Sequence, residues 1–413
     1  MTRVPAEKVV RSIIHQQFPT LPRQQRRALA RWVMGALLAG SANGPSVIQA
    51  LATAGVAAPS TLSDQWDAWL AQPAYQTTEP PHAEAPPLLS PLACGTWLLR
   101  WVVQLWTEDF LVLGVDASLR RDEVGLLRIS VLYRATAIPV AWVMVPANTP
   151  GAWQPHWERM LCWVATAIPA EKLVLVMADR GLWSPRLWQA IVAQSWHPVL
   201  RIQGTATFAP TGEGRQRVTQ LIGGPGHAWS GEGTAFKHTP KRIRGTMAAV
   251  WDPEQKEPWA LLTELPASQM DAAWYALRMW DEEGFRQSKS MGWDWQRGQL
   301  ERVDAVAWQY LVVAVATLWA LAVGTRIEDA QQQRMAPGRL RRPPCTSVPC
   351  RRRRSGTALR MVSLLQQGCQ KLRWMLARGR IWGRLWLRPE PLPETPNTIR
   401  VHIHSPSPCG EMI

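Results

Sequence analysis

The sequence predicts an α/β fold built on a mixed β-sheet that is flanked by helices. Apolar runs of strand length, rich in Val, Leu and Ile, recur between residues 110 and 202. Segments with helical periodicity separate the last three runs, so the order is three strands, helix, strand, helix, strand. The expected strands cover residues 110–115, 124–133, 138–145, 173–178 and 199–202, and the expected helices cover 153–167 and 184–194.

The N-terminal residues 1–72 are predicted to form a helical domain. Apolar residues recur at three- and four-residue steps over 9–18 and 24–38, and Pro59 opens a further helix. The second segment carries four arginines on its polar side: Arg23, Arg26, Arg27 and Arg31. This basic face suits a DNA-binding domain, and it equally suits the solvated surface of any helical domain.

The middle of the chain divides by composition. Residues 73–91 are rich in Pro and form a predicted linker. The α/β domain then follows in two parts, 92–203 and 267–326, each containing helical segments. Between them, residues 204–266 are rich in Gly and Thr and are expected to form a β-rich insertion. Its strand-like pieces lie at 217–222 and 246–251.

The C-terminal part of the chain changes to Arg, Pro and Gln. Residues 327–388 are predicted to form a basic region that contains a four-arginine run at 351–354. A basic amphipathic helix is expected at 357–378. The Pro-rich tail at 389–413 is predicted to be disordered.

The charge of the chain indicates a polyanionic partner. The 413 residues carry a formal net charge of +15, and Lys and Arg gain binding free energy when they displace counterions from phosphates. A merely basic cytosolic protein is the alternative. The six cysteines form no CxxC pair, as expected of reduced thiols in the cytoplasm. The N-terminus lacks the apolar core of a secretory signal, so we expect a cytoplasmic, nucleoid-associated bacterial protein.

The segment 303–323 is apolar enough to resemble a membrane span. Asp304 and Gln309 interrupt it, so its uninterrupted apolar stretch is shorter than the ~20 residues that a bilayer requires. We therefore predict a buried helix in the core of a protein without a membrane partner. A membrane-associated basic protein is the alternative that this segment leaves open.

Two aspartates follow apolar runs of strand length. Asp116 comes after LVLGV, and Asp179 comes after LVLVMA and before Arg180 and Gly181, which begin a turn. Polar groups at the strand ends of an α/β sheet gather where ligands bind. Either aspartate taken alone is as well explained as a cap of a helix or turn.

A predicted helix from residue 267 to 289 supplies a third acid. At ~100° per residue, one face of this helix carries Tyr275, Arg278, Glu282 and Lys289, whereas Asp281 and Glu283 point away from it. The geometry therefore selects Glu282 from the acidic cluster. An ordinary amphipathic helix with an Arg–Glu pair at i,i+4 explains the same pattern.

The spacing Tyr-x2-Arg-x3-Glu-x6-Lys resembles the YREK signature of insertion-sequence DDE transposases, the cut-and-paste group with a β-rich insertion. Tyr275, Arg278, Glu282 and Lys289 match it at every spacing. The segments LGVDAS and VMADRG resemble the first and second Asp motifs of that family. The resemblance covers roughly residues 110–324 and implies a ribonuclease H-like domain with a five-stranded mixed sheet.

The resemblance implies a metal-dependent chemistry and a DNA substrate. In it, Asp116, Asp179 and Glu282 hold two Mg²⁺ ions, with Mn²⁺ able to substitute, and Asp116 bridges both. The metal-activated water or 3′-hydroxyl attacks the phosphodiester. The other three signature residues, Tyr275, Arg278 and Lys289, contact phosphates near the transposon end. The implied partners are double-stranded DNA, as terminal inverted repeats and target, and a second copy of the chain in a homodimer on paired ends.

The insertion contains further candidates for DNA contact. Trp229 and Trp251 are base-stacking candidates, because relatives stack a flipped base on a tryptophan of the insertion. Packing in a core explains them better, since the chain has 25 tryptophans. Lys241, Arg242 and Arg244 are candidates for backbone contact, and a solvated face is an equal alternative.

Two functions follow. The first is an active transposase that cleaves transposon ends and joins them to target DNA. The second is a DNA-binding derivative that keeps the fold and the basic surface without activity; the intact acids at positions 116, 179 and 282 argue against it.

Overall fold

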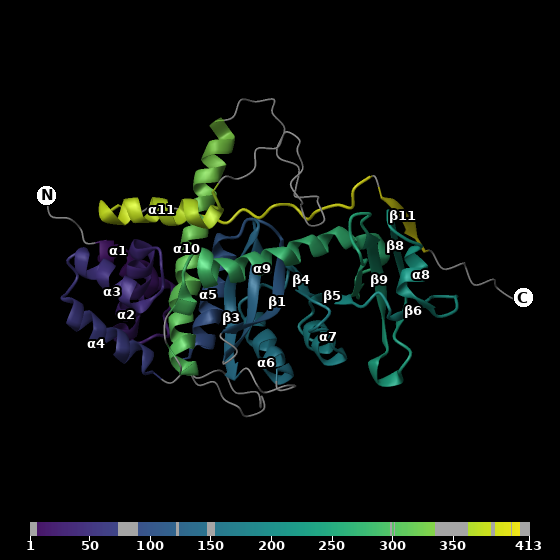
Figure 1. The fold of residues 1–413 in the computed structure, drawn as a ribbon, viewed down its shortest axis with the longest axis horizontal. Helices are drawn as coiled ribbons and strands as arrows, with labels where there is room; N and C mark the ends of the chain where they lie inside the picture. The colour runs from purple at the N-terminus through teal and green to yellow at the C-terminus, as the bar shows by residue number, and fades with distance from the viewer. Residues whose placement is uncertain are drawn as a thin grey trace, which may run out of the picture.

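The computed structural model describes residues 6–72, 90–120, 124–146, 153–297, 300, 302–334, 362–380, 385–397 and 399–404. Helices gather at one end of the molecule, a β-sheet runs through its middle, and the insertion lies at the other end (Figure 1). The strands of the described residues form one mixed sheet of eleven strands. The predicted α/β class is confirmed.

The first half of the sheet contains the five expected strands, in the order β3-β2-β1-β4-β5. β1, β2 and β3 form an antiparallel meander, whereas β4 and β5 run parallel to β1. Their burial is nearly complete, which explains why they read as continuous apolar runs. Their bounds are Phe110–Arg120, Val124–Tyr133, Thr136–Pro146, Leu173–Ala178 and His197–Ile202.

The insertion continues the same sheet instead of forming a separate one. β10 (Trp259–Thr263) pairs with β5, and β9 (Ile243–Trp251), β8 (His227–Ala235), β6 (Thr207–Pro210) and β7 (Gln216–Arg217) follow. The expected β-rich character is therefore confirmed, as is a strand at 246–251.

The predicted strand at 217–222 is wrong. Val218–Ile222 forms a helix, α8. The backbone N–H of Arg217 donates to the Gln220 side chain, and Gly223 ends the helix at φ 84°. Val218 and Ile222, four residues apart, are both buried on the same side of this turn.

The N-terminal bundle consists of α1 (Ala6–Gln17), α2 (Arg23–Ala39), α3 (Gly44–Thr53) and α4 (Pro59–Leu70), as its helical periodicity predicts, and it packs against α10 (Val303–Arg334) and α11 (Leu364–Ala377). The helices α5 (Pro91–Leu105) and α6 (Gln154–Ala165) pack on β3, and α7 (Pro185–Val192) packs on β5. Ser90 and Ser184 cap α5 and α7 by accepting backbone hydrogen bonds. Most of the predicted linker lies outside the described residues, but Ser90 and Pro91 already belong to the start of α5.

The apolar segment at 303–323 forms the first two-thirds of a long helix, α10 (Val303–Arg334). It is the one helix of the described residues long and apolar enough to cross a membrane, and its apolar stretch is entirely buried inside the protein. It packs against the N-terminal bundle, α5 and β3, and Gln309 donates to the carbonyl of Ala42. The prediction of a buried core helix is confirmed.

The single long helix predicted at 267–289 is wrong. Residues 270 and 271 are extended, and the Asp271 side chain accepts from the N–H of Ala273, which starts the helix only at residue 272. A 3₁₀ helix, η3 (Ala272–Arg278), leads into α9 (Met279–Arg286) and a π-helical turn (Gln287–Met291). The signature residues are therefore spread over three helix types.

The C-terminal segment crosses the whole molecule. α11 (Leu364–Ala377) packs on α10 and α2, and residues 385–397 then run toward the insertion (Figure 1). β11 (Arg400–Ile403) adds a parallel strand to β8. The prediction of a disordered tail is thus wrong for residues 389–397 and 399–404, because β11 pairs with β8 and the Asp271 side chain accepts from the backbone N–H of Thr395. Residues 398 and 405–413 of that tail lie outside the described residues. The four-arginine run at 351–354 lies outside the described residues.

Candidate active site

Strand register brings Asp116 next to Asp179. β1 and β4 are parallel, and their last pair is Val115 with Ala178. The two aspartates are the next residue on each chain, so their side chains leave the sheet on the same side. The sequence predicts that Asp116 lies at or near the end of its strand. In the structure β1 continues past Asp116 and pairs with β2 as far as Arg120. Asp116 lies where β1 loses its parallel neighbour and keeps its antiparallel one.

Arg278 connects Asp116 to Glu282. Its guanidinium donates to Oδ2 of Asp116 at 2.8 Å and to Oε1 of Glu282 at 2.6 Å. The Arg278 side chain is only 8% exposed, whereas the Glu282 side chain is 55% exposed. The two carboxylates thus converge on one cation, one from the sheet and one from α9.

Tyr275 connects the same helical segment to Asp179. Its hydroxyl donates to Oδ1 of Asp179 at 3.1 Å. Burial and the charge of Asp179 raise the pKa of Tyr275, so the phenol stays protonated and remains a donor. Tyr275 and Arg278 are three residues apart in a 3₁₀ helix, in which such residues lie on one side.

The Asp116 carboxyl is destabilised in its ionised form. Burial raises its pKa from the ordinary value of 3.8 to about 6; Arg278 lowers it, and the charge of Asp281 raises it. The site therefore holds a buried carboxyl whose neighbouring cation offsets only part of the desolvation. A further cation near Asp116 would stabilise the ionised form.

The neighbours of Glu282 are engaged elsewhere, as the sequence predicts. Asp281 forms an ion pair of 2.6 Å with Arg128 of β2, and neither side chain is exposed. Glu283 pairs with Arg286 on the outer side of α9. Of the three consecutive acids, only Glu282 shares a cation with Asp116.

Lys289 reaches the same strand as Asp116. Its ammonium donates to the carbonyl of Leu119 on β1 at 3.2 Å. Burial and the charge of Arg128 lower the pKa of Lys289. The ammonium is thus placed three residues beyond Asp116, beside the candidate site.

The carboxylates fit a divalent cation by donor type. Mg²⁺ and Mn²⁺ prefer oxygen ligands, and two carboxylates already share one cationic group here. Within the described residues, no three acidic, histidine or cysteine side chains stand close enough together to hold a metal as they are. Asp116, Asp179 and Glu282 are the residues that could hold a metal ion. The guanidinium of Arg278, which lies between Asp116 and Glu282, would first have to move away.

The insertion candidates divide into exposed cations and packed tryptophans. Lys241, Arg242 and Arg244 are all exposed. Trp229 is 4% exposed and packs edge-on against Phe208 and face-on against His404. Trp251 is partly buried, and its indole N–H donates to the carbonyl of Gln255. Packing accounts for both tryptophans.

Sequence reasoning missed three residues around the site. Arg201 of β5 lies 3.7 Å from Oδ1 of Asp179, and its position in a buried strand was a usable signal. Trp183, in the turn after Asp179, stacks on Phe236 of the insertion with ring centroids 4.2 Å apart. Arg128 is the one charged residue of β2, and no local pattern in the sequence links it to Asp281.

In comparisons with known proteins, no family model and no curated protein matches this chain.

Proposed function

We propose that this chain is a DNA transposase of the DDE class with a ribonuclease H-like catalytic domain. It cleaves transposon ends and joins them to target DNA by phosphoryl transfer. The proposal includes a Mg²⁺-dependent site, a double-stranded DNA substrate, a homodimer on paired ends and localisation at the bacterial nucleoid.

The observation that carries the proposal is the convergence of five residues from three distant segments: β1, the end of β4, and the continuous segment η3–α9. Three of the four YREK residues contact the site directly or through one another: Tyr275 binds Asp179, and Arg278 binds Asp116 and Glu282. The aspartates come from adjacent parallel strands. A signature that arose by chance on an ordinary amphipathic helix has no reason to meet both aspartates.

The strand order also supports the proposal. An antiparallel meander is followed by two parallel strands, with one acid on the first strand, one directly after the fourth strand and one on a late helix, and this order fits the ribonuclease H-like domain that the resemblance implies. The β-rich insertion enters between the second and third acids, as in that family.

The residues of the chain have distinct roles in this proposal. Asp116, Asp179 and Glu282 would hold the metal ions, and the bound ions would supply Lewis-acid chemistry for phosphoryl transfer. Arg278 and Lys289 offer positive charge to the phosphates beside the scissile bond. Tyr275 holds Asp179 in place through its hydroxyl. Lys241, Arg242 and Arg244 offer exposed positive charge along the insertion.

The test uses the purified chain with DNA that contains the flanking repeats of its own coding region and with Mg²⁺. We expect wild type to nick and join these ends, and Asp179→Asn to lose at least a hundredfold in rate while retaining DNA binding. Glu264→Gln, which removes an exposed acid that contacts His197 away from the site, is the matched control. Equal rates for wild type and Asp179→Asn would make the catalytic assignment wrong, and an inactive wild type that binds the ends would favour the non-catalytic derivative.

A further inference from the structure

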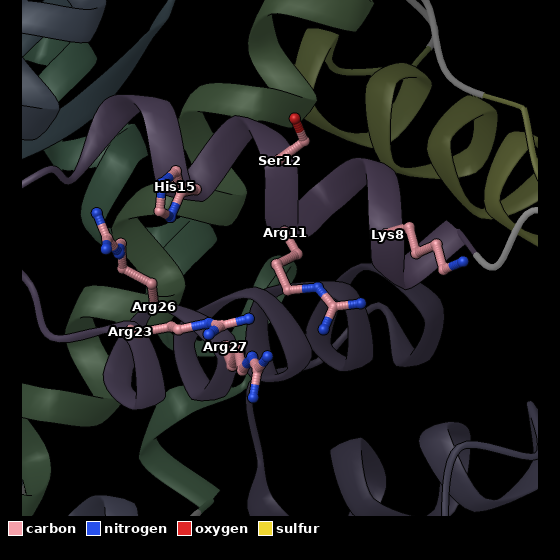
Figure 2. A pocket seen from close by; sticks show the side chains of 7 residues that line it. All are labelled: Lys8, Arg11, Ser12, His15, Arg23, Arg26 and Arg27. Atoms are coloured by element: carbon pink, nitrogen blue, oxygen red, sulfur yellow. The ribbon is translucent and has the colours of Figure 1, made fainter.

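The N-terminal bundle contains a pocket that is unconnected with the carboxylate site. It has a volume of about 320 Å³ and lies between α1 and α2 (Figure 2). Six basic side chains line it: Lys8, Arg11, His15, Arg23, Arg26 and Arg27. In Figure 2, Arg11 reaches from α1 toward α2, where Arg23 and Arg27 lie. The two helices therefore present their basic sides to a common space.

The cations of this pocket are not neutralised by the protein. Within the residues that the structure describes, Lys8, Arg11, Arg23 and Arg27 form no ion pair with an acid. The acid of α1, Glu7, lies 3.8 Å from Arg31, which is not part of the pocket lining. α2 contains no acidic residue at all. The pocket is consequently a concentrated and unpaired positive charge.

The spacing of these residues makes the arrangement costly without a ligand. Arg23 and Arg27 are four residues apart on α2, and Lys8 and Arg11 are three apart on α1. Like charges at such spacing destabilise a helix. An ordinary solvated helix face mixes acids with bases, and this one does not. A bound anion would remove the repulsion between the two helices.

The backbone adds a contribution of the same sign. α2 begins at Arg23 after Pro22, and no side chain caps its N-terminus. The first N–H groups of this 17-residue helix and the positive end of its dipole therefore stand at the edge of the pocket. Arg26 is held in position by a hydrogen bond from its guanidinium to the carbonyl of Pro19.

We propose that this pocket is a phosphate-binding site, and that arginines from α1 and α2 grip one or two phosphate groups. Arginine presents its donors in a fork that matches phosphate oxygens. The phosphate belongs either to the backbone of duplex DNA or to a free phosphate compound. The lining of the pocket includes none of the residues Asp116, Asp179 and Glu282. A test of phosphate binding in the pocket is therefore independent of a test of the proposed catalysis.

The first arm of the test measures binding of a generic DNA duplex to the full chain as a function of salt. Arg23→Gln/Arg27→Gln removes two pocket charges that are exposed. Arg297→Gln/Arg334→Gln removes two exposed charges far along the chain and is the matched control. Each phosphate contact contributes about 0.9 to the slope of log K against log salt. We expect the slope to fall by about 2 in the pocket variant and to stay unchanged in the control.

The second arm measures binding of inorganic pyrophosphate by calorimetry at constant ionic strength. A DNA slope that falls only in the pocket variant identifies duplex DNA as the source of the phosphate. Unchanged DNA binding with pyrophosphate binding lost in the pocket variant identifies a free phosphate compound. Arg23→Lys/Arg27→Lys keeps the charge but loses the fork of donors, so we expect it to keep the wild-type salt slope and to bind pyrophosphate more weakly than wild type. The proposal is overturned if the pocket variant and the control behave alike in both arms.

Discussion

The guanidinium of Arg278 lies 2.8 Å from Oδ2 of Asp116, so it is bound to a carboxylate that a metal ion would need as a ligand. The same guanidinium holds Glu282, and 8% of the Arg278 side chain is exposed. Under the proposed function, metal ions would compete with Arg278 for two of the three acids, Asp116 and Glu282. A DNA phosphate that draws the guanidinium away would free both carboxylates, so DNA and metal should bind cooperatively under the proposed function.

Arg278→Gln should bind Mn²⁺ more tightly than wild type in the absence of DNA. The substitution removes the competing cation, and we expect an affinity gain of about tenfold, equivalent to ~1.4 kcal/mol. Isothermal titration with Mn²⁺ measures it. Arg286→Gln is the control, because Arg286 lies on the same helix and pairs with Glu283 instead. Weaker or unchanged Mn²⁺ binding by Arg278→Gln would refute the competition.

Binding of Mn²⁺ should strengthen as pH rises through about 6. The pKa of Asp116 is raised from 3.8 to about 6, so the carboxyl is largely protonated at pH 5 and largely ionised at pH 7. A metal ion binds the ionised form and must displace the proton at low pH. Mn²⁺ titrations between pH 5 and 8 should show the affinity rising and then levelling off. In Asp116→Asn the rise near pH 6 should vanish; its persistence would assign the titration to another group.

Asp281→Asn should destabilise the fold strongly, whereas Glu283→Gln should not. Asp281 is fully buried against Arg128, whose guanidinium also lies 3.4 Å from the Phe285 ring centroid and donates to Tyr310. Removing one partner of a buried pair leaves an uncompensated charge and costs about 3–5 kcal/mol. The Glu283 pair is partly open to solvent, with the Arg286 side chain exposed, and is worth about 0–1 kcal/mol. Urea unfolding of both variants measures the difference, and equal losses would contradict it.

Gly368→Ala should loosen the contact between α11 and α10. A methyl group at Gly368 would collide with the backbone carbonyl of Ala320, and backbone cannot move aside as a side chain can. Overpacking of this kind costs typically about 1–3 kcal/mol. Gly214→Ala, where an added methyl group meets nothing, should leave the melting temperature within about a degree. A Gly368→Ala variant as stable as wild type would show that the two helices can separate freely.

Local sequence patterns were sufficient to predict the strands of the sheet, but they were insufficient to predict the helix type of the segment that carries Tyr275, Arg278, Glu282 and Lys289. β2 and β4 have the predicted bounds, because a strand buried on both faces must be apolar throughout. The helix predicted at 267–289 failed because the Asp271 side chain competes with the backbone and delays helix formation. Periodicity measures the apolar face and does not register such a competitor.

The acids of the candidate site could be selected from the sequence, but their partners could not. Glu282 is distinguishable from Asp281 by helical spacing alone, whereas the bond from Arg278 to Asp116 joins residues that are far apart in the chain. The pairing of Arg128 with Asp281 and the addition of β11 to β8 are equally non-local. Contacts of this kind depend on how the elements pack, and no periodicity encodes them.

The position of β11 has a consequence for the behaviour of the protein in solution. β8 pairs with β9 along one side; on its other side, β6 covers residues 233–235 and β11 covers residues 227–230. Without β11, four residues of β8 would offer unpaired backbone donors and acceptors to any passing chain. A truncation before residue 399 would therefore keep Asp116, Asp179 and Glu282 but expose an unpaired strand edge, which is a template for aggregation. We expect such a protein to precipitate while its candidate site stays intact.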